Sequence, residues 1–191
     1  MVKMQFGVLI PHFGKETSPS RIIEGSKLCE ELGFDSIWVR DHLIWNPHGM
    51  ERAGLRFIEP FVTLAAVAAV TRKIKLATAV LVPVRWPLKL SQDLASLSFI
   101  AGGRVIAGIG LGFNPEELAT VGMRIEDRID IMRETVEIAR LIWQENNASY
   151  SGKIFSFENV TIEPKPTEPI PIFGGGSTRA AIRRVAEYCD G

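Results

Sequence analysis

Short apolar runs alternate five times along the chain with longer segments whose apolar residues recur at helical spacing. A strand followed by a helix, repeated in this way, predicts a parallel β-sheet covered by helices. The runs contain few polar residues, as expected for strands buried on both faces. The predicted strands are 4–11, 34–39, 73–82, 104–112 and 169–173, and the predicted helices are 19–32, 59–71, 87–101, 126–145 and 178–189.

Capping residues mark the ends of the first predicted helix. Ser18 is placed to accept a free amide hydrogen, Pro19 fits the first turn, and Gly33 ends the helix. We expect a buried stripe on this helix and another on the helix at 126–145. The stripes are Ile22, Ser26, Cys29 and Leu32, and Ile129, Met132, Val136 and Ala139.

Two architectures place helices on a parallel sheet. A doubly wound sheet would be complete at 191 residues, whereas a (β/α)₈ TIM barrel typically needs about 250. The chain ends at Cys189-Asp190-Gly191, without the polar residues that usually finish a domain. We therefore expect a single α/β domain, 1–191, made of the first five βα units of a barrel. Alternation within 149–164 predicts a small hairpin, so 146–168 is interpreted as an insertion before the fifth strand.

Composition and net charge indicate which kinds of binding partner to expect. Hydrophobic residues make up 46% of the chain, enough for one core, and 22 basic residues balance 22 acidic ones. Zero net charge gives no reason to expect nucleic acid or an anionic membrane as partner. The longest mostly apolar stretch, 60–70, is too short to span a bilayer, and the N-terminus lacks a signal-type cleavage site. We expect a cytoplasmic protein in which Cys29 and Cys189 are small buried hydrophobes.

Residues capable of chemistry follow four of the five predicted strands. Parallel strands place their carboxyl ends on one face, so these residues would meet there. Asp41 could accept a hydrogen bond from a cofactor, and His42 can exchange a proton near neutral pH. Equally, Asp41 could cap a loop, and His12 could cap the turn after the first strand. The set is His12, Asp41-His42, Gly110-Leu111-Gly112-Phe113-Asn114 and Gly174-Gly175-Gly176-Ser177.

The three consecutive glycines join a predicted strand to a helix start. Backbone N–H groups in such a turn can bind a phosphate. The turn has no Lys and no G-x-G-x-x-G spacing, so it is neither a P-loop nor a dinucleotide fingerprint. The other reading is that the glycines only let helix and strand pack closely. We expect Arg179, Arg183 and Arg184, just beyond the turn, to form a solvated helix face.

Several stretches in combination carry a family resemblance. They are ELGFDSIWVRDHL, KIKLATAVLVP, GGRVIAGIGLGFNPEE and IEPKPTEPIPIFGGGST, followed by AEYCDG. Their order and spacing resemble the luciferase-like flavin and deazaflavin oxidoreductases over nearly the whole chain. The sequence Trp-Val-Arg-Asp-His after the second strand is most similar to the coenzyme F420-dependent branch. The resemblance implies a (β/α)₈ barrel with an insertion before the fifth strand, and a homodimer.

The resemblance also implies a cofactor site. Gly174, Gly175, Gly176 and Ser177 correspond to the family's site for the phosphate of the flavin or F420 side chain. Ala79-Val80 stands where the family has a non-proline cis peptide behind the ring. Asp41 matches the residue that bonds the polar edge of the ring, and Leu111-Gly112 match a backbone contact.

For the substrate, the resemblance points to His42 as the catalytic residue. It matches the histidine beside the hydride-accepting carbon, where it could move a substrate proton or orient the substrate. Sugar-phosphate dehydrogenases of this branch carry Glu where this chain has Phe113, which indicates a more apolar pocket. His12 and Trp45 are further candidates for the substrate pocket, while His48 lies in a polar loop and is expected to be solvated.

We therefore expect an F420-dependent oxidoreductase that moves a hydride between F420 and a small organic substrate. An FMN-dependent monooxygenase on the same scaffold, using reduced flavin and O₂, is the first alternative. A non-catalytic flavin-binding barrel is the second. A metal hydrolase is more distant, because only one histidine follows the first strand and none follows strands three to five. No metal is expected.

Overall fold

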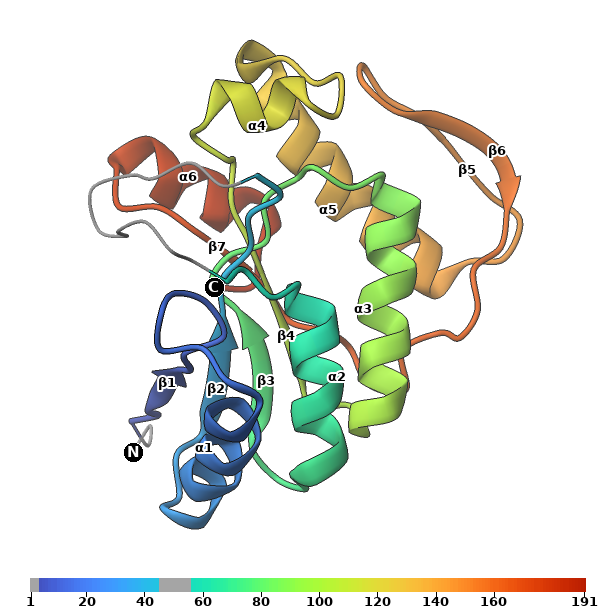
Figure 1. Cartoon of the computed structure of the whole chain (residues 1–191). Coiled ribbons are helices and arrows are strands. Elements are labelled where there is room, and N and C mark those ends of the chain that lie inside the picture. Colours follow the sequence, from blue (N-terminus) through green and yellow to red (C-terminus); the bar gives the residue numbers. More distant parts are fainter. Residues whose placement is uncertain (1–3, 45–55) are drawn as a thin grey trace.

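The computed structural model describes residues 4–44 and 56–191. Five parallel strands form one sheet in the order β1-β2-β3-β4-β7 (Figure 1). The order in the sheet is the order along the chain, as in a (β/α)₈ barrel, whereas a doubly wound sheet reverses its order at a switch point. The predicted α/β fold of five successive βα units is confirmed. The strands are β1 (Gly7–Leu9), β2 (Ser36–Val39), β3 (Lys75–Thr78), β4 (Val105–Ile109) and β7 (Ile172–Gly174).

Five longer helices connect and follow these strands, and consecutive ones contact each other. They are α1 (Pro19–Glu31), α2 (Pro60–Val70), α3 (Pro87–Ala101), α5 (Arg128–Gln144) and α6 (Arg179–Tyr188). Between β4 and α5 lie the short helix α4 (Pro115–Ala119) and the 3₁₀ helix η1 (Ile125–Asp127). Within the described ranges, no helix combines the length and the apolar character needed to cross a membrane.

The predicted helix starts are accurate, but two predicted stripe positions are wrong. Oγ of Ser18 accepts a hydrogen bond from the Arg21 amide at 3.2 Å, so Ser18 caps α1 as expected. Leu32 is 67% exposed and Ile129 is 46% exposed. Leu32 is the C-cap of α1 and Ile129 lies in the first turn of α5, so both lie beyond the turns that pack against neighbouring elements.

The two cysteines are free and half-buried rather than fully buried. Cys29 and Cys189 pack against the edge of the main core cluster. Burial raises the pKa of both thiols. Their behaviour as small hydrophobic side chains agrees with the expectation from sequence.

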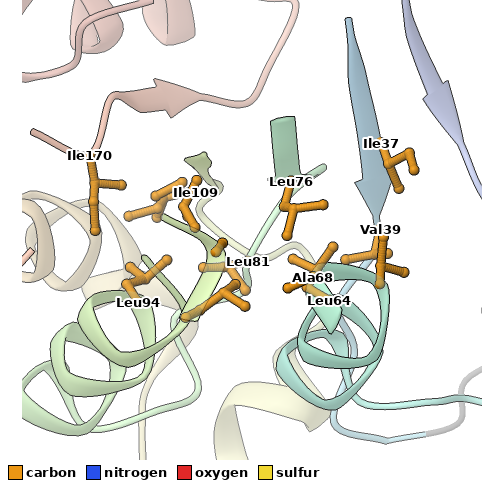
Figure 2. Close-up of a cluster of buried hydrophobic side chains, with 14 of the residues drawn as sticks. Ile37, Val39, Leu64, Ala68, Leu76, Leu81, Leu94, Ile109 and Ile170 are labelled. Atoms are coloured by element: carbon orange, nitrogen blue, oxygen red, sulfur yellow. The ribbon is translucent and has the colours of Figure 1, made fainter. Parts of the chain in front are cut away.

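The main core lies between the sheet and the helices (Figure 2). Leu76, Leu81 and Ile109 come from the β3–β4 region and have no exposed surface. Leu64 of α2 and Leu94 of α3 cover them from the helix layer. Each fully buried Leu or Ile side chain contributes about 1.5–3 kcal/mol.

The ends of β3 and β4 are tied together by a threonine and a glycine. Oγ1 of Thr78 donates to the carbonyl oxygen of Gly108 and accepts from its amide, both at 2.9 Å. A Cβ on Gly108 would lie 1.9 Å from the Thr78 carbonyl oxygen, so this close approach requires glycine. The pairing fixes the point at which the chain leaves β3 for Ala79.

The predicted hairpin forms beside α5, away from the sheet (Figure 1). Its antiparallel strands are β5 (Ala148–Ser151) and β6 (Ser156–Val160). The carboxylate of Glu134, buried on α5, accepts amide hydrogens from Lys153 at 2.8 Å, Ile154 at 3.1 Å and Phe155 at 2.9 Å. The hairpin is therefore attached to α5 through its own backbone.

Candidate active site

A cavity of about 630 Å³ opens at the carboxyl ends of β2, β3, β4 and β7. This is the rim at which the sequence places its chemistry-capable residues. Most of the predicted site residues line it, from four separate strand ends. They are Asp41, His42, Ala79, Val80, Leu111, Gly112, Phe113, Gly175, Gly176 and Ser177.

His12 is a correction, because it does not line this cavity. Its side chain has no exposed surface. Nε2 accepts a hydrogen bond from the Arg40 amide at 3.1 Å, and Nδ1 lies 3.3 Å from the Ile10 carbonyl oxygen. Burial lowers the pKa of His12 below its ordinary value. His12 therefore ties the end of β1 to the end of β2 and does not reach a substrate.

Gly174 is a second correction. A Cβ there would lie 2.3 Å from Cγ2 of Val185 on α6, so this glycine allows close packing of strand and helix. It is absent from the cavity lining, so only Gly175 and Gly176 of the three glycines face the cavity. The interpretation that the glycines let helix and strand pack closely is therefore correct for Gly174.

Trp45 and His48 lie outside the described residues.

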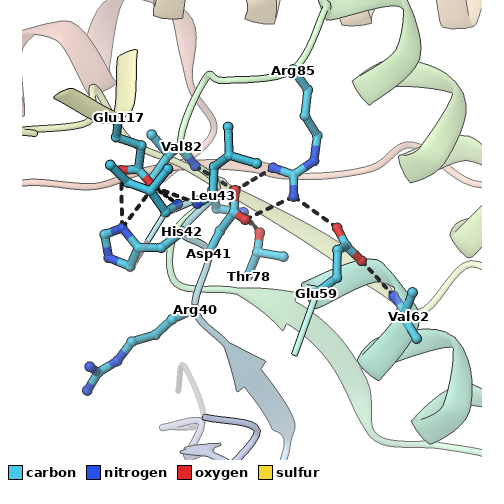
Figure 3. A network of polar contacts seen from close by, with 12 residues as sticks. Arg40, Asp41, His42, Leu43, Glu59, Val62, Thr78, Val82, Arg85 and Glu117 are labelled. Carbon is cyan, nitrogen blue, oxygen red and sulfur yellow. Dashed lines mark hydrogen bonds and ion pairs between the residues drawn. The ribbon is translucent and has the colours of Figure 1, made fainter. Parts of the chain in front are cut away.

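The carboxylate of Asp41 is fully buried and bound by Arg85 (Figure 3). Nη1 and Nη2 of Arg85 donate to its two oxygens at 2.5 and 2.9 Å, and the Val82 amide donates at 3.0 Å. The side chain of Asp41 has no exposed surface, although the residue is part of the cavity lining. A further correction concerns the expectation that this carboxylate accepts a hydrogen bond from a cofactor ring, because both of its oxygens are bound by Arg85 and Val82 and neither is exposed.

Arg85 connects Asp41 to helix α2. Its Nη2 also donates to Oε1 of Glu59 at 2.9 Å, and Oε2 of Glu59 caps α2 through the Val62 amide at 2.8 Å. Burial disfavours the charge on Arg85, but the ion pair with Asp41 outweighs it and raises the pKa of the guanidinium. Sequence analysis did not identify Arg85, because its partner lies 44 residues away in the chain.

His42 is held by a glutamate that the sequence analysis also missed. Glu117 of α4 is 1% exposed, and its carboxylate lies 3.2 Å from Nδ1 of His42. The same carboxylate accepts the Leu43 amide at 2.6 Å. Burial opposes ionisation of Glu117, but these hydrogen bonds outweigh it and lower its pKa. Figure 3 shows both contacts at the end of β2.

Aromatic side chains surround the His42 ring. Phe57 and Phe113 meet it edge to face, with centroid distances of 5.6 and 6.1 Å. Phe113 is 62% exposed and lines the cavity. Two aromatic rings therefore contact the His42 imidazole, and one of them, Phe113, is part of the cavity lining.

The segment after β3 packs against the backbone at two glycines, Gly110 and Gly175, through the side chain of Val80. The Ala79-Val80 peptide is cis, as the family resemblance implies. A Cβ on Gly110 would lie 2.5 Å from Cγ2 of Val80, and a Cβ on Gly175 would lie 3.1 Å from its Cγ1. The Leu81 amide donates to Gly108 at 2.7 Å, which holds this segment on β4.

The other end of the cavity is formed by the turn before α6 and by arginines. Gly176 has φ +137°, and Thr178 caps α6 by accepting the Ala181 amide at 3.1 Å. Arg184 is half-buried and lines the cavity, contrary to the expectation of a solvated face, whereas Arg179 and Arg183 are exposed. Arg40 and Arg128 line the same cavity. A helix N-terminus beside arginines favours an anion.

Residues 4–44 and 56–191 hold no group of three or more His, Cys, Asp or Glu side chains arranged to bind a metal ion.

Residues 4–191 match the family described as luciferase-like monooxygenase. An uncharacterized protein of Mycobacterium tuberculosis is 36% identical over an alignment of 203 positions, gaps included, that covers 98% of this chain and 71% of the relative. The F420-dependent glucose-6-phosphate dehydrogenase of Amycolatopsis mediterranei is 29% identical over 91% of this chain. The chain spans 51%, about half, of the length of that dehydrogenase.

Solved structures share the fold. An F420-dependent secondary alcohol dehydrogenase in complex with an F420-acetone adduct superposes with a TM-score of 0.86 at 23% identity, over 99% of this chain and 57% of that one. A type II Baeyer-Villiger monooxygenase from Pseudomonas putida in complex with FMN superposes with a TM-score of 0.78 at 22% identity, over 97% and 56%.

Proposed function

Because the chain belongs to the luciferase-like monooxygenase family, we propose that it forms part of an F420-dependent oxidoreductase that transfers a hydride to or from a small organic substrate. One observation carries the proposal. A single cavity joins an imidazole in an apolar surround to a cationic turn at a helix N-terminus. These are the two environments that a redox ring with an anionic side chain needs.

The residues present fit such a cofactor. The main-chain amides at Gly176, Ser177 and the start of α6 would hold a phosphate, with Arg184 supplying charge. The Gly175 amide is already bound to the Ile109 carbonyl oxygen at 2.9 Å, so it belongs to the sheet instead. The Ala79-Val80 segment and Leu111 would contact the ring from the cavity wall.

Proton handling falls to His42. When bound, F420 carries two electrons as a hydride and so supplies the redox chemistry. Transfer of a hydride to or from a substrate carbon leaves a proton to be moved, and an imidazole at the cavity wall can take it up or return it. Phe57 and Phe113 limit water around that imidazole.

F420 is favoured over FMN by the relatives, since the dehydrogenase from Amycolatopsis mediterranei is named for F420. The second candidate is an FMN-dependent monooxygenase, which the fold shared with the FMN-bound enzyme from Pseudomonas putida supports. A non-catalytic flavin-binding barrel would bind cofactor without turnover.

The homodimer that the family resemblance implies is also part of the proposal. Sedimentation equilibrium tests it directly.

The deciding experiment mixes the purified protein with F420 and, separately, with FMN, removes free ligand, and records absorbance. Retention of F420, with reduction that is insensitive to oxygen, supports the proposal. Retention of FMN, with oxygen consumption when the flavin is reduced, supports the monooxygenase instead. Retention of neither contradicts both.

A further inference from the structure

Glu117 is a buried carboxylate in contact with His42. Its side chain is 1% exposed. Its oxygens Oε1 and Oε2 lie 3.3 and 3.2 Å from Nδ1 of His42, and Oε1 also accepts the amides of Leu43 at 2.6 Å and Ile44 at 3.5 Å. Burying a carboxylate is costly unless it is paired and hydrogen-bonded. The contacts at the end of β2 supply that compensation.

The chemistry of the two groups decides which nitrogen bears the hydrogen. The hydrogen bonds lower the pKa of Glu117, so the carboxylate is ionised near neutral pH. An ionised carboxylate can only accept hydrogen bonds, so Nδ1 of His42 must carry the hydrogen. In a neutral imidazole the other nitrogen, Nε2, then bears the lone pair.

We propose that Glu117 is a positioning residue that holds the His42 imidazole with its hydrogen on Nδ1 and thereby makes Nε2 the nitrogen that exchanges a proton with the substrate. The use of Nε2 rests on the proposed function. The position of the hydrogen does not.

Other charged groups also act on His42 and must be separated from Glu117. Arg40, Arg128 and Arg184 line the same cavity, and nearby positive charge in general disfavours a protonated imidazole. Asp41 is the neighbouring residue, but its carboxylate is paired with Arg85. Glu117 is the carboxylate in hydrogen-bonding contact with Nδ1, so its removal tests the proposal directly.

A merely structural role for Glu117 is the alternative. The carboxylate also accepts the Leu43 amide, and it could serve only to hold the chain after β2. The substitution Glu117→Gln separates the two roles, because it removes the charge and leaves one acceptor oxygen for the His42 ring and the Leu43 and Ile44 amides. The matched control is Glu116→Gln, since Glu116 is the preceding residue on α4 and is exposed.

The experiment labels the histidines with ¹⁵N and records two-bond nitrogen–proton correlations during a pH titration. The chain has three histidines, and a His42→Gln variant assigns the His42 signals. We expect the Nδ1-protonated tautomer in the wild type. In Glu117→Gln the tautomer becomes mixed and the midpoint of His42 protonation moves to lower pH by about one unit. Glu116→Gln leaves both unchanged.

An Nε2-protonated ring in the wild type overturns the proposal, and so does a Glu117→Gln variant with unchanged tautomer and midpoint. If circular dichroism shows that this variant is unfolded, the wild-type tautomer alone decides. Neither measurement requires cofactor or turnover. A failure of F420 to bind would therefore count against the proposed function and leave this result standing.

Discussion

Arg85 binds both carboxylate oxygens of Asp41 from 44 residues away in the chain, at 2.5 and 2.9 Å. Asp41 follows β2, and Arg85 lies just before α3, where it also reaches Glu59 at the start of α2. One guanidinium therefore fixes the end of a strand relative to the starts of two helices. Figure 3 shows this guanidinium between Asp41, which is part of the cavity lining, and Glu59.

Removing Arg85 should strongly destabilise the protein. Arg85→Ala leaves the fully buried Asp41 carboxylate without its charged partner, which typically costs about 3–5 kcal/mol. Urea unfolding followed by circular dichroism measures the free energy of unfolding. The control is Arg21→Ala, whose pair with Glu16 is more than half exposed, at 55% and 56%. A pair of that kind contributes about 1 kcal/mol or less. Equal losses in the two variants would contradict the role given to Arg85.

Replacing His42 should lower turnover more than cofactor affinity. We expect His42→Ala to reduce the turnover of the active oxidoreductase by about 10²-fold or more, because general acid–base catalysis is worth that much. Binding of F420, followed by its fluorescence, should change little, since the imidazole lies apart from the turn before α6. Unchanged turnover would remove His42 from the catalytic assignment.

Gly176→Ala should weaken binding of a phosphate-bearing cofactor. Gly176 has φ +137°, and an added Cβ would lie 2.6 Å from Cβ of Ala181, so the first turn of α6 must shift. Loss of one hydrogen bond to a charged group costs about 1.5–3 kcal/mol. That loss corresponds to at least about tenfold in the dissociation constant, which calorimetric titration with F420 measures.

The matched control for that substitution is Gly25→Ala. Gly25 lies within α1, and nothing lies within 4 Å of an added Cβ. This variant should bind F420 as the wild type does and be slightly more stable, by roughly 0.5–1 kcal/mol. Parallel behaviour of the two glycine variants would argue against an anion site at Gly176.

Stability should depend on pH partly through Glu117. Its pKa is lowered in the folded state, so the folded state binds fewer protons than the unfolded state around pH 4. The resulting stabilisation is complete above the ordinary carboxylate range and is lost as pH falls through the folded pKa. The difference in unfolding free energy between wild type and Glu117→Gln should therefore be larger at pH 7 than at pH 3. A difference independent of pH would contradict the assignment.

The fold could be predicted from sequence because its signals are local. Alternating apolar runs and helical stripes recur within short windows, and Pro19, Ser18 and Gly102 mark helix ends. The errors lie at helix ends, at Leu32 and Ile129, where periodicity continues but packing does not. The position of the cavity that most candidate residues line could also be predicted, because parallel strands bring their carboxyl ends to one rim.

The interactions within the site could not be predicted in the same way. Glu117 lies 75 residues from His42, and Arg85 lies 44 from Asp41, so neither pair shows a pattern in the sequence. The orientation of Asp41 follows from Arg85, and the burial of His12 follows from its contacts with Arg40. Of the three glycines, Gly174 packs against Val185 of α6, a contact that no local pattern in the sequence reveals.

The attachment of the hairpin suggests where this scaffold tolerates new sequence. Glu134 accepts hydrogen bonds from the main-chain amides at 153–155. These contacts do not depend on which side chains most positions of the strands carry. The solvent-facing positions Ser149, Ser156 and Glu158 are remote from the cavity rim. An engineer seeking to add an epitope or a surface-immobilisation handle would find a suitable grafting position there, with the redox chemistry left undisturbed.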